Sequence, residues 1–187
     1  YALQSNTAAN NVALGYDSAY QNTSGTSNTA LGYYALQSNT TASDNTAVGY
    51  QSGYSNTTGG ANTSVGRGAG FSTTTGTNNT ALGYLSLASN TTASNNTAVG
   101  YQAGYSNTTG QLLTAVGYQA LYANSGDTYS TALGARTLQS NTTGFENVAV
   151  GDLSSNTNTT GGYLTSVGNR SLQSNTTGSY NTALGHS

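Results

Sequence analysis

The residues of this chain that can do acid–base, nucleophilic or metal chemistry are few and scattered. The only His is His186, and it has no acidic neighbour in the sequence. The five acidic residues are Asp17, Asp44, Asp127, Glu146 and Asp152. General acid–base catalysis needs two such groups in fixed proximity, yet no two of these acids occupy the same place in adjacent 17-residue repeats. The chain also has no Cys for thiol chemistry or a disulfide. We therefore expect no enzyme, no metal site and no cofactor.

Charge and hydropathy exclude two classes of partner. The 187 residues carry a net charge of −2, with three Arg and no Lys. Such a chain cannot neutralise a phosphate backbone, so we expect no nucleic acid partner. The Gly-rich stretch 66–70 lacks the Lys and the helix of a phosphate-binding loop. No apolar run approaches the roughly 20 residues that cross a bilayer, so this segment is not expected to span a membrane.

Tyrosine is the one chemically versatile side chain that recurs at a fixed spacing. Six of the 15 Tyr share a 17-residue register: Tyr16, Tyr33, Tyr50, Tyr84, Tyr101 and Tyr118. An exposed row of this kind is a candidate for contact with sugars or another surface. The alternative is that the rings pack between chains or against the ring of the next repeat. After Tyr118 the register holds Ala135, Asp152, Asn169 and His186, so the row ends in the last third of the chain.

The Tyr row belongs to a repeat that fills residues 1–187 as a single array. A hexapeptide, Asn-Thr-Ala-Leu/Val-Gly-Tyr in its best copies, recurs every 17 residues. Its copies begin at Asn11, Asn28, Asn45, Asn62, Asn79, Asn96, Leu113, Ser130, Asn147, Leu164 and Asn181. A fixed short period predicts a solenoid in which each repeat packs only on its neighbours. The chain begins and ends inside a repeat, and we interpret it as a segment of a longer fibre.

Numbered from the start of the hexapeptide, repeat positions 2 to 4 predict a short β-strand. Position 2 is Thr or Val, position 3 is Ala or Ser, and position 4 is always aliphatic. This alternation places positions 2 and 4 on one face of a strand and positions 1 and 3 on the other. We expect position 4 to form the structural core: Leu14, Leu31, Val48, Val65, Leu82, Val99, Val116, Leu133, Val150, Val167 and Leu184.

Position 5 is Gly in every copy and predicts a bend with a left-handed or otherwise strained backbone. These glycines are Gly15, Gly32, Gly49, Gly66, Gly83, Gly100, Gly117, Gly134, Gly151, Gly168 and Gly185. Positions 8 to 10 predict a second short strand. There, position 8 is small, and Leu at position 9 trades with an aromatic ring at position 10, as expected where bulky groups of successive coils interdigitate.

Positions 12 to 15, Asn-Thr-Thr-Gly or close to it, have the composition of a turn. Stacked in successive coils, the Asn residues of positions 12 and 1 are expected to form amide ladders. One coil per repeat at the strand spacing of about 4.8 Å gives eleven coils a length of about 50 Å. So small a coil buries little apolar area against the backbone entropy of its residues. We therefore expect several chains to associate, with the small positions 3 and 8 facing the neighbouring chain.

The hexapeptide resembles the Asn-Ser-Val-Ala-Ile-Gly motif of YadA-type adhesin heads. The copies at 45–50 and 96–101, Asn-Thr-Ala-Val-Gly-Tyr, align on their Gly, with Thr46 and Val48 at the Val and Ile of the motif. Such repeats occur in trimeric autotransporter adhesins and, in similar form, in phage tail fibres. The resemblance implies a left-handed parallel β-roll, a homotrimer, an extracellular location on a cell or virion surface, and binding to matrix proteins or surface glycans. The period here, 17 residues, exceeds the usual 14 or so of that family.

The fold class expected is therefore all-β, a parallel β-roll or solenoid with one 17-residue coil per repeat. The function expected is a non-enzymatic, structural or adhesive extracellular fibre segment that binds copies of itself. An adhesin head and a tail-fibre shaft remain open alternatives. A glycan-binding module that uses the Tyr row is a third. An ice-binding solenoid is a weaker fourth, since the adjacent Thr40 and Thr41 would point to opposite sides.

Overall fold

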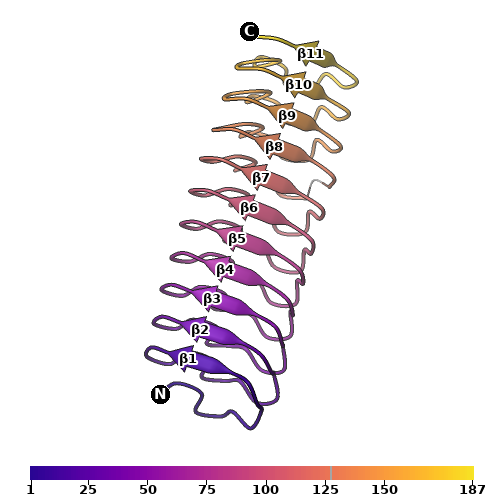
Figure 1. Ribbon diagram of the computed structural model, residues 1–187. Coiled ribbons are helices and arrows are strands. Elements are labelled where there is room, and N and C mark those ends of the chain that lie inside the picture. The colour runs from indigo at the N-terminus through magenta and orange to yellow at the C-terminus, as the bar shows by residue number, and fades with distance from the viewer. Residues whose placement is uncertain (127) are drawn as a thin grey trace.

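The computed structural model describes residues 1–126 and 128–187 and shows one parallel sheet of eleven strands in chain order. Figure 1 shows the strands stacked along a rod, with the two termini at opposite ends. The strands are β1 Val12–Leu14, β2 Thr29–Leu31, β3 Thr46–Val48, β4 Thr63–Val65, β5 Thr80–Leu82, β6 Thr97–Val99, β7 Thr114–Val116, β8 Thr131–Leu133, β9 Val148–Val150, β10 Thr165–Val167 and β11 Thr182–Leu184. The expected all-β solenoid with one coil per repeat is confirmed.

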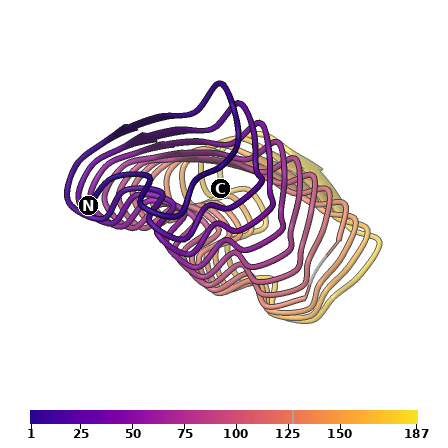
Figure 2. The same ribbon diagram turned by 90° about the horizontal axis from the view of Figure 1, so that it is seen from below.

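Every strand pairs with the next at an offset of 17 residues. Ala98 lies opposite Ala115, and Val99 lies opposite Val116, without a slip in any pair along the sheet. The turns are also hydrogen-bonded from coil to coil: Gln102 N–H donates to Tyr84 O at 2.9 Å, and Gly104 N–H to Ala120 O at 2.9 Å. Seen from below, the coils follow one another with similar outlines (Figure 2). Each residue therefore lies against its own counterpart in the next coil.

In residues 1–126 and 128–187 each coil contains one strand, and the predicted second strand at positions 8 to 10 is not formed. Positions 7 and 9 have left-handed backbone angles; for example, φ is +53° at Gln102 and +48° at Leu87. Alternating left-handed residues curl the chain into turns, which an extended strand cannot do. The small and apolar residues of positions 8 to 10 favour a strand. The tight curvature that a 17-residue coil requires at this point prevents the extended backbone of a strand.

The prediction that position 4 forms the core is wrong. Position 3 points into the coil instead, with Ala30, Ala47, Ala98 and Ala132 fully buried. The aliphatic residues that lie on the outer face, none of them buried, are Leu14, Leu31, Val48, Val65, Leu82, Val99, Val116, Leu133, Val150, Val167 and Leu184. The alternation of faces was predicted correctly, but its assignment to inside and outside was inverted.

The interior is too narrow for two opposing large side chains. A Cβ added at Gly53, position 9, would lie 3.7 Å from Ala47 Cβ, position 3, and 3.0 Å from Leu36 Cδ2 of the preceding coil. The strand therefore faces position 9 across the coil, and the large buried side chains there are Leu36, Leu87, Leu121 and Leu138. Leu36 fills the space beside Gly53 of the next coil, so the interdigitation expected for Leu at position 9 is confirmed. The rings of position 10 do not share this space, since Tyr54 and Phe71 are half-buried and stack on each other.

This narrowness also corrects the expectation for positions 3 and 8. Both are small because the walls of one coil approach each other, and they do not face a neighbouring chain. Where Ser155 replaces Leu at position 9, its hydroxyl lies 2.8 Å from Ser166 Oγ, and Ser154 Oγ donates to Ser166 O at 3.0 Å. These interior Ser hydroxyls are therefore hydrogen-bonded, as buried polar groups usually are.

Position 5 glycines form a column in which, from Gly15 to Gly168, an added Cβ would clash with the backbone of the next coil. Their φ angles range from +123° to +139°, and a Cβ at Gly100 would lie 2.5 Å from Gly117 O of the next coil. The expected role of Gly15 to Gly185 as turn residues is confirmed by these angles. Among the described residues there is also no helix long and apolar enough to cross a membrane.

We predict that Gly100→Ala destabilises the fold by about 3 kcal/mol or more, because it combines backbone strain with a backbone clash. Chemical denaturation followed by circular dichroism measures this loss. Gly126→Ala is the matched control, since its Cβ would meet only Thr109 Oγ1 at an ordinary 3.5 Å, and should change stability by less than about 0.5 kcal/mol. Equal effects of the two substitutions would contradict the packing described.

Candidate functional site

The side chains with hydrogen-bonding capacity are arranged as columns along the rod, and two columns of Asn lie inside it. At position 12, Asn107 Nδ2 donates to Asn90 Oδ1 at 3.0 Å and to Gly110 O at 2.9 Å. Its Oδ1 accepts from Gly110 N–H and from Asn124 Nδ2, both at 3.0 Å. The predicted amide ladder is confirmed at this position, and Thr73 interrupts it in one coil.

The Asn column at position 1 works differently. Asn79 Oδ1 accepts the backbone N–H of Asn96 at 3.0 Å, and Asn79 Nδ2 donates to Ala93 O at 2.9 Å. Its amide therefore bonds backbone groups of the next coil, and not the next amide. Both columns satisfy the polar backbone of turns that are buried on their inner side. Their role is structural, and they offer nothing to a ligand.

We predict that Asn107→Thr lowers the free energy of unfolding by about 1–3 kcal/mol, because it leaves buried amide and carbonyl groups without partners. Thermal or urea denaturation measures the change. Asn169→Thr is the control, since Asn169 is exposed. If the two variants were equally stable, the buried amide column would contribute nothing to the fold.

The outer face of the sheet carries repeat positions 2 and 4 and contains no charged residue. Leu31, Leu82 and Leu133 are 41%, 44% and 46% exposed, and the Val residues at position 4 are half-buried. The residues of position 2 lie beside them in strict register. The result is a mixed methyl and hydroxyl surface that runs the length of the rod. We call it the sheet face.

The Tyr row forms a ladder on the outside of the coils. Tyr16, Tyr33 and Tyr50 stack in sequence, with ring centroids 5.2 and 5.6 Å apart, and Tyr84, Tyr101 and Tyr118 stack at 5.2 Å each. These six rings are 37–58% exposed. Because the rings stack face to face, each interior ring shows solvent its edge and hydroxyl. The prediction that the row packs ring upon ring is confirmed, and most ring faces are unavailable to a ligand.

Arg67 completes the ladder where Tyr is missing. Its guanidinium carbon lies 5.6 Å from the Tyr50 ring centroid and 5.7 Å from that of Tyr84. A guanidinium is planar and stacks on aromatic faces, so it replaces a ring with little loss. Arg67 was not predicted as part of the row. Its place at repeat position 6, which it shares with the six Tyr, is the signal in the sequence that could have identified it.

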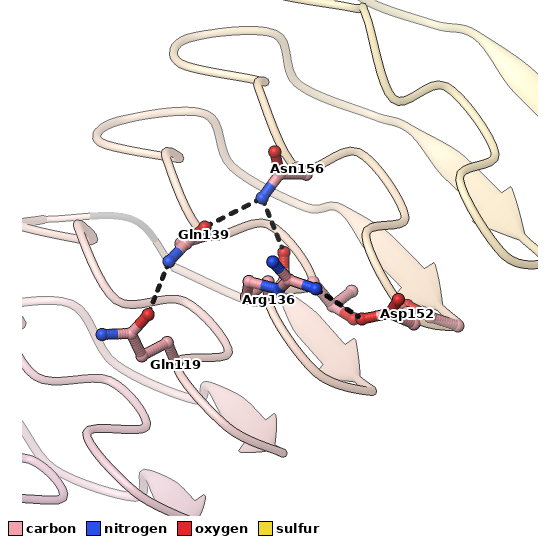
Figure 3. A network of polar contacts seen from close by, with 7 residues as sticks. Gln119, Arg136, Gln139, Asp152 and Asn156 are labelled. Carbon is pink, nitrogen blue, oxygen red and sulfur yellow. Dashed lines mark hydrogen bonds and ion pairs between the residues drawn. The ribbon is translucent and has the colours of Figure 1, made fainter.

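The ladder ends at Tyr118 beside a polar network (Figure 3). Gln119 Nε2 donates to Gln102 Oε1 at 2.9 Å, and Gln139 Nε2 donates to Gln119 Oε1 at 2.7 Å. Asn156 Nδ2 then donates to Gln139 Oε1 at 3.0 Å and to Arg136 O at 3.1 Å. These surface amides are held in place by one another.

The four acidic residues that the structure describes do not come together in one place. Asp152 pairs with Arg136, with 3.8 Å between Oδ1 and Nη2, while Asp44 and Glu146 lie several coils apart. Asp127 lies outside the described residues. His186 contacts the hydroxyl of its neighbour Ser187, with Nδ1 2.9 Å from Ser187 Oγ. Within the described parts of the chain no three His or acidic residues gather as metal ligands would.

Two tyrosines have raised pKa values. A hydrogen bond with Tyr33, followed by desolvation and by the charges of Tyr33, Tyr16 and Asp17, raises the pKa of Tyr34 to about 12. The charge of Glu146 and, to a smaller extent, desolvation and Tyr180 raise the pKa of Tyr163. Both phenols therefore stay neutral at ordinary pH, and they act as packing groups, not as acids or bases.

We predict that Arg67→Ala splits the ladder and reduces the near-ultraviolet circular dichroism of the stacked rings. The accompanying loss of stability should be about 0.5–1 kcal/mol. Arg67→Tyr should keep or strengthen the signal, because it restores an uninterrupted column of rings. Identical spectra for Arg67→Ala and the unmodified chain would show that the guanidinium does not join the two halves.

Comparison with protein families, with curated proteins and with solved structures finds no match for this chain.

Proposed function

We propose that this chain is a non-enzymatic segment of an extracellular fibre that associates with copies of itself, as a homotrimer or a filament, and takes part in attachment to a surface. The observation that carries this proposal is the sheet face, an uncharged column of exposed Leu and half-buried Val side chains along the rod. Contiguous apolar surface of this extent is typical of an interface.

A second copy of the chain is a suitable partner for the sheet face. Its side chains repeat at the same strand spacing, so the ridges of one rod match the grooves of another over their full length. Burying exposed Leu and Val side chains contributes about 25 cal/mol per Å². No charge on this face has to be desolvated. The association expected from the small coil is therefore supported, but through positions 2 and 4.

The surface chemistry is consistent with an extracellular role. Only three Arg and no Lys offer tryptic sites, and the exposed turns are rich in Thr, Ser and Gly. The resemblance of the hexapeptide to adhesin-head and tail-fibre repeats agrees with this role on a cell or a virion. Both alternatives describe the same physical object, a stiff rod that holds a binding surface away from its anchor.

A second candidate function rests on the Thr residues of position 2. Thr29, Thr46, Thr63, Thr80 and Thr97 occur once per coil in strict register on the sheet face. A flat, regular array of hydroxyls and methyls can order water as an ice surface does. The Thr pair in the turns, considered in the sequence analysis, is not part of this array. Thermal hysteresis of the dissolved chain tests this candidate, and its absence removes it.

We predict that the chain sediments as a trimer of about 56 kDa, three times 18.8 kDa, or as a larger assembly. The double variant Leu82→Asp, Leu133→Asp should be monomeric and still folded, because both side chains are exposed in the single chain and carboxylates resist burial. Analytical ultracentrifugation and circular dichroism measure the two properties. Thr109→Asp, in an exposed turn, is the control and should assemble normally. An unmodified chain that stays monomeric at high concentration would contradict the proposal.

A further inference from the structure

Tyr118 ends the Tyr ladder on its C-terminal side, where one face of its ring has no stacking partner among the described residues. Tyr118 stacks on Tyr101 at 5.2 Å with an interplanar angle of 8°, but position 6 of the next coil is Ala135. Tyr118 is 50% exposed, compared with 37% for Tyr84 and 44% for Tyr101 within the ladder. Among the described residues no ring or guanidinium stacks on its second face. We call Tyr118, Ala135, Arg136 and Asp152 the ladder end.

At the ladder end, position 6 carries no ring in the coil after Tyr118 and a polar residue in the coil after that. Asp152 occupies position 6 two coils beyond Tyr118, and two strand spacings amount to about 10 Å. Arg136 reaches across to pair with Asp152 at 3.8 Å, and Arg136 N–H donates to Tyr118 O at 2.7 Å. The column therefore carries an apolar ring face, a small residue, and then a carboxylate with a guanidinium.

The amides of Figure 3 line the same stretch of the rod. Gln119 follows Tyr118 in the chain, and Gln139 and Asn156 continue the hydrogen-bonded series past Ala135. Each of these amides has two N–H donors. Gln119 and Gln139 each donate once within the series, so a donor remains on each for a ligand.

We propose that the ladder end binds a neutral pyranose ring of a glycan, which takes the place of the missing rung. A pyranose has an apolar C–H face that stacks on an aromatic ring, and hydroxyls around its edge that need both donors and acceptors. Tyr118 supplies the face, and the Arg136–Asp152 pair and the amides supply the edge groups. A purely aromatic ligand would leave these polar groups unused.

The charges favour a neutral sugar. The Arg136 and Asp152 side chains are 46% and 41% exposed, so their ion pair is weak and its groups can turn to sugar hydroxyls at little cost. Because the two charges cancel, neither an acidic nor a basic sugar gains a net attraction. The interior rings Tyr33, Tyr50, Tyr84 and Tyr101 do not form equivalent sites, since both of their faces are covered by a neighbouring ring or by Arg67. Tyr16, at the N-terminal end of the row, also stacks on one face only, but the Arg136–Asp152 pair is not beside it.

This inference deepens the proposed function, and it rests on that function only for the use of the site in attachment. The contacts of the ladder end lie within one chain, so binding itself does not require assembly. If the unmodified chain is monomeric and binds sugar, the proposed oligomer is refuted and the sugar site at the ladder end is retained. If the chain assembles but binds no sugar, the sugar site is refuted and the oligomer is retained.

The test uses methyl β-D-galactopyranoside, methyl β-D-glucopyranoside and methyl α-D-mannopyranoside as probes, with phenol as the non-sugar comparison. Binding is followed by saturation-transfer NMR and by backbone amide shifts around Ala135 and Arg136. We expect at least one glycoside to bind in the millimolar range and to shift these amides. Tyr118→Ala should weaken it by about tenfold or more, the scale of one aromatic stacking contact, and Tyr118→Phe should retain it.

Ala135→Tyr is the decisive variant, because it extends the ladder and covers the free face of Tyr118 with another ring. It should abolish glycoside binding while the fold is unchanged or more stable, and Ala135→Ser should bind like the unmodified chain. Undiminished binding by Ala135→Tyr would overturn the proposal. So would binding of phenol with none of the three glycosides, or the absence of any glycoside-dependent shift at the ladder end.

Discussion

The whole structure depends on one constraint: each side chain must pack against its own counterpart 17 residues later, one strand spacing away. Residues that pair well with copies of themselves satisfy it, such as the Asn amides of position 12 and the rings of position 6. Like charges at this spacing repel each other. This explains why only 4% of the residues are charged, and why the charged residues do not occupy the same position in adjacent coils. The low charge is a consequence of stacking and needs no separate explanation from solubility or partners.

The same constraint makes the interior unusual. A 17-residue coil that turns sharply at positions 5, 7, 9 and 17 has opposite walls so close that Ala and Gly face each other across it. Backbone N–H and C=O groups of the turns point into the coil, and the Asn side chains of positions 1 and 12 form hydrogen bonds with them. The aliphatic side chains that a wider coil would bury are left on the sheet face. The two faces of one three-residue strand therefore differ in role: the inner face packs within the chain, and the outer face is the one through which we propose that chains associate.

The period and the alternation of side chains were sufficient to predict the parallel coils, the position 5 bend and the amide column at position 12. They could not decide which face of the strand points inward, because Ala-lined and Leu-lined interiors show the same alternation. That choice depends on coil width, which follows from the left-handed turns at positions 7 and 9, and residues such as Gln102 and Leu87 give no local signal for them. The Tyr row was visible in the sequence, but the stacking that covers the faces of its interior rings and leaves one face of Tyr118 free required the geometry of the ladder.

Beside the backbone hydrogen bonds and the buried Leu residues of position 9, it is the buried Asn amides, and not the Leu and Val residues of position 4, that stabilise the stack of coils. Hydrogen exchange of the Asn side-chain amides, measured by NMR on the monomeric sheet-face variant, tests this role most directly. The account predicts that the NH₂ groups of buried residues such as Asn79, Asn96 and Asn107 exchange as slowly as the backbone amides of the strands. Exchange at the rate of a free Asn side chain, in a chain that remains folded, would contradict it.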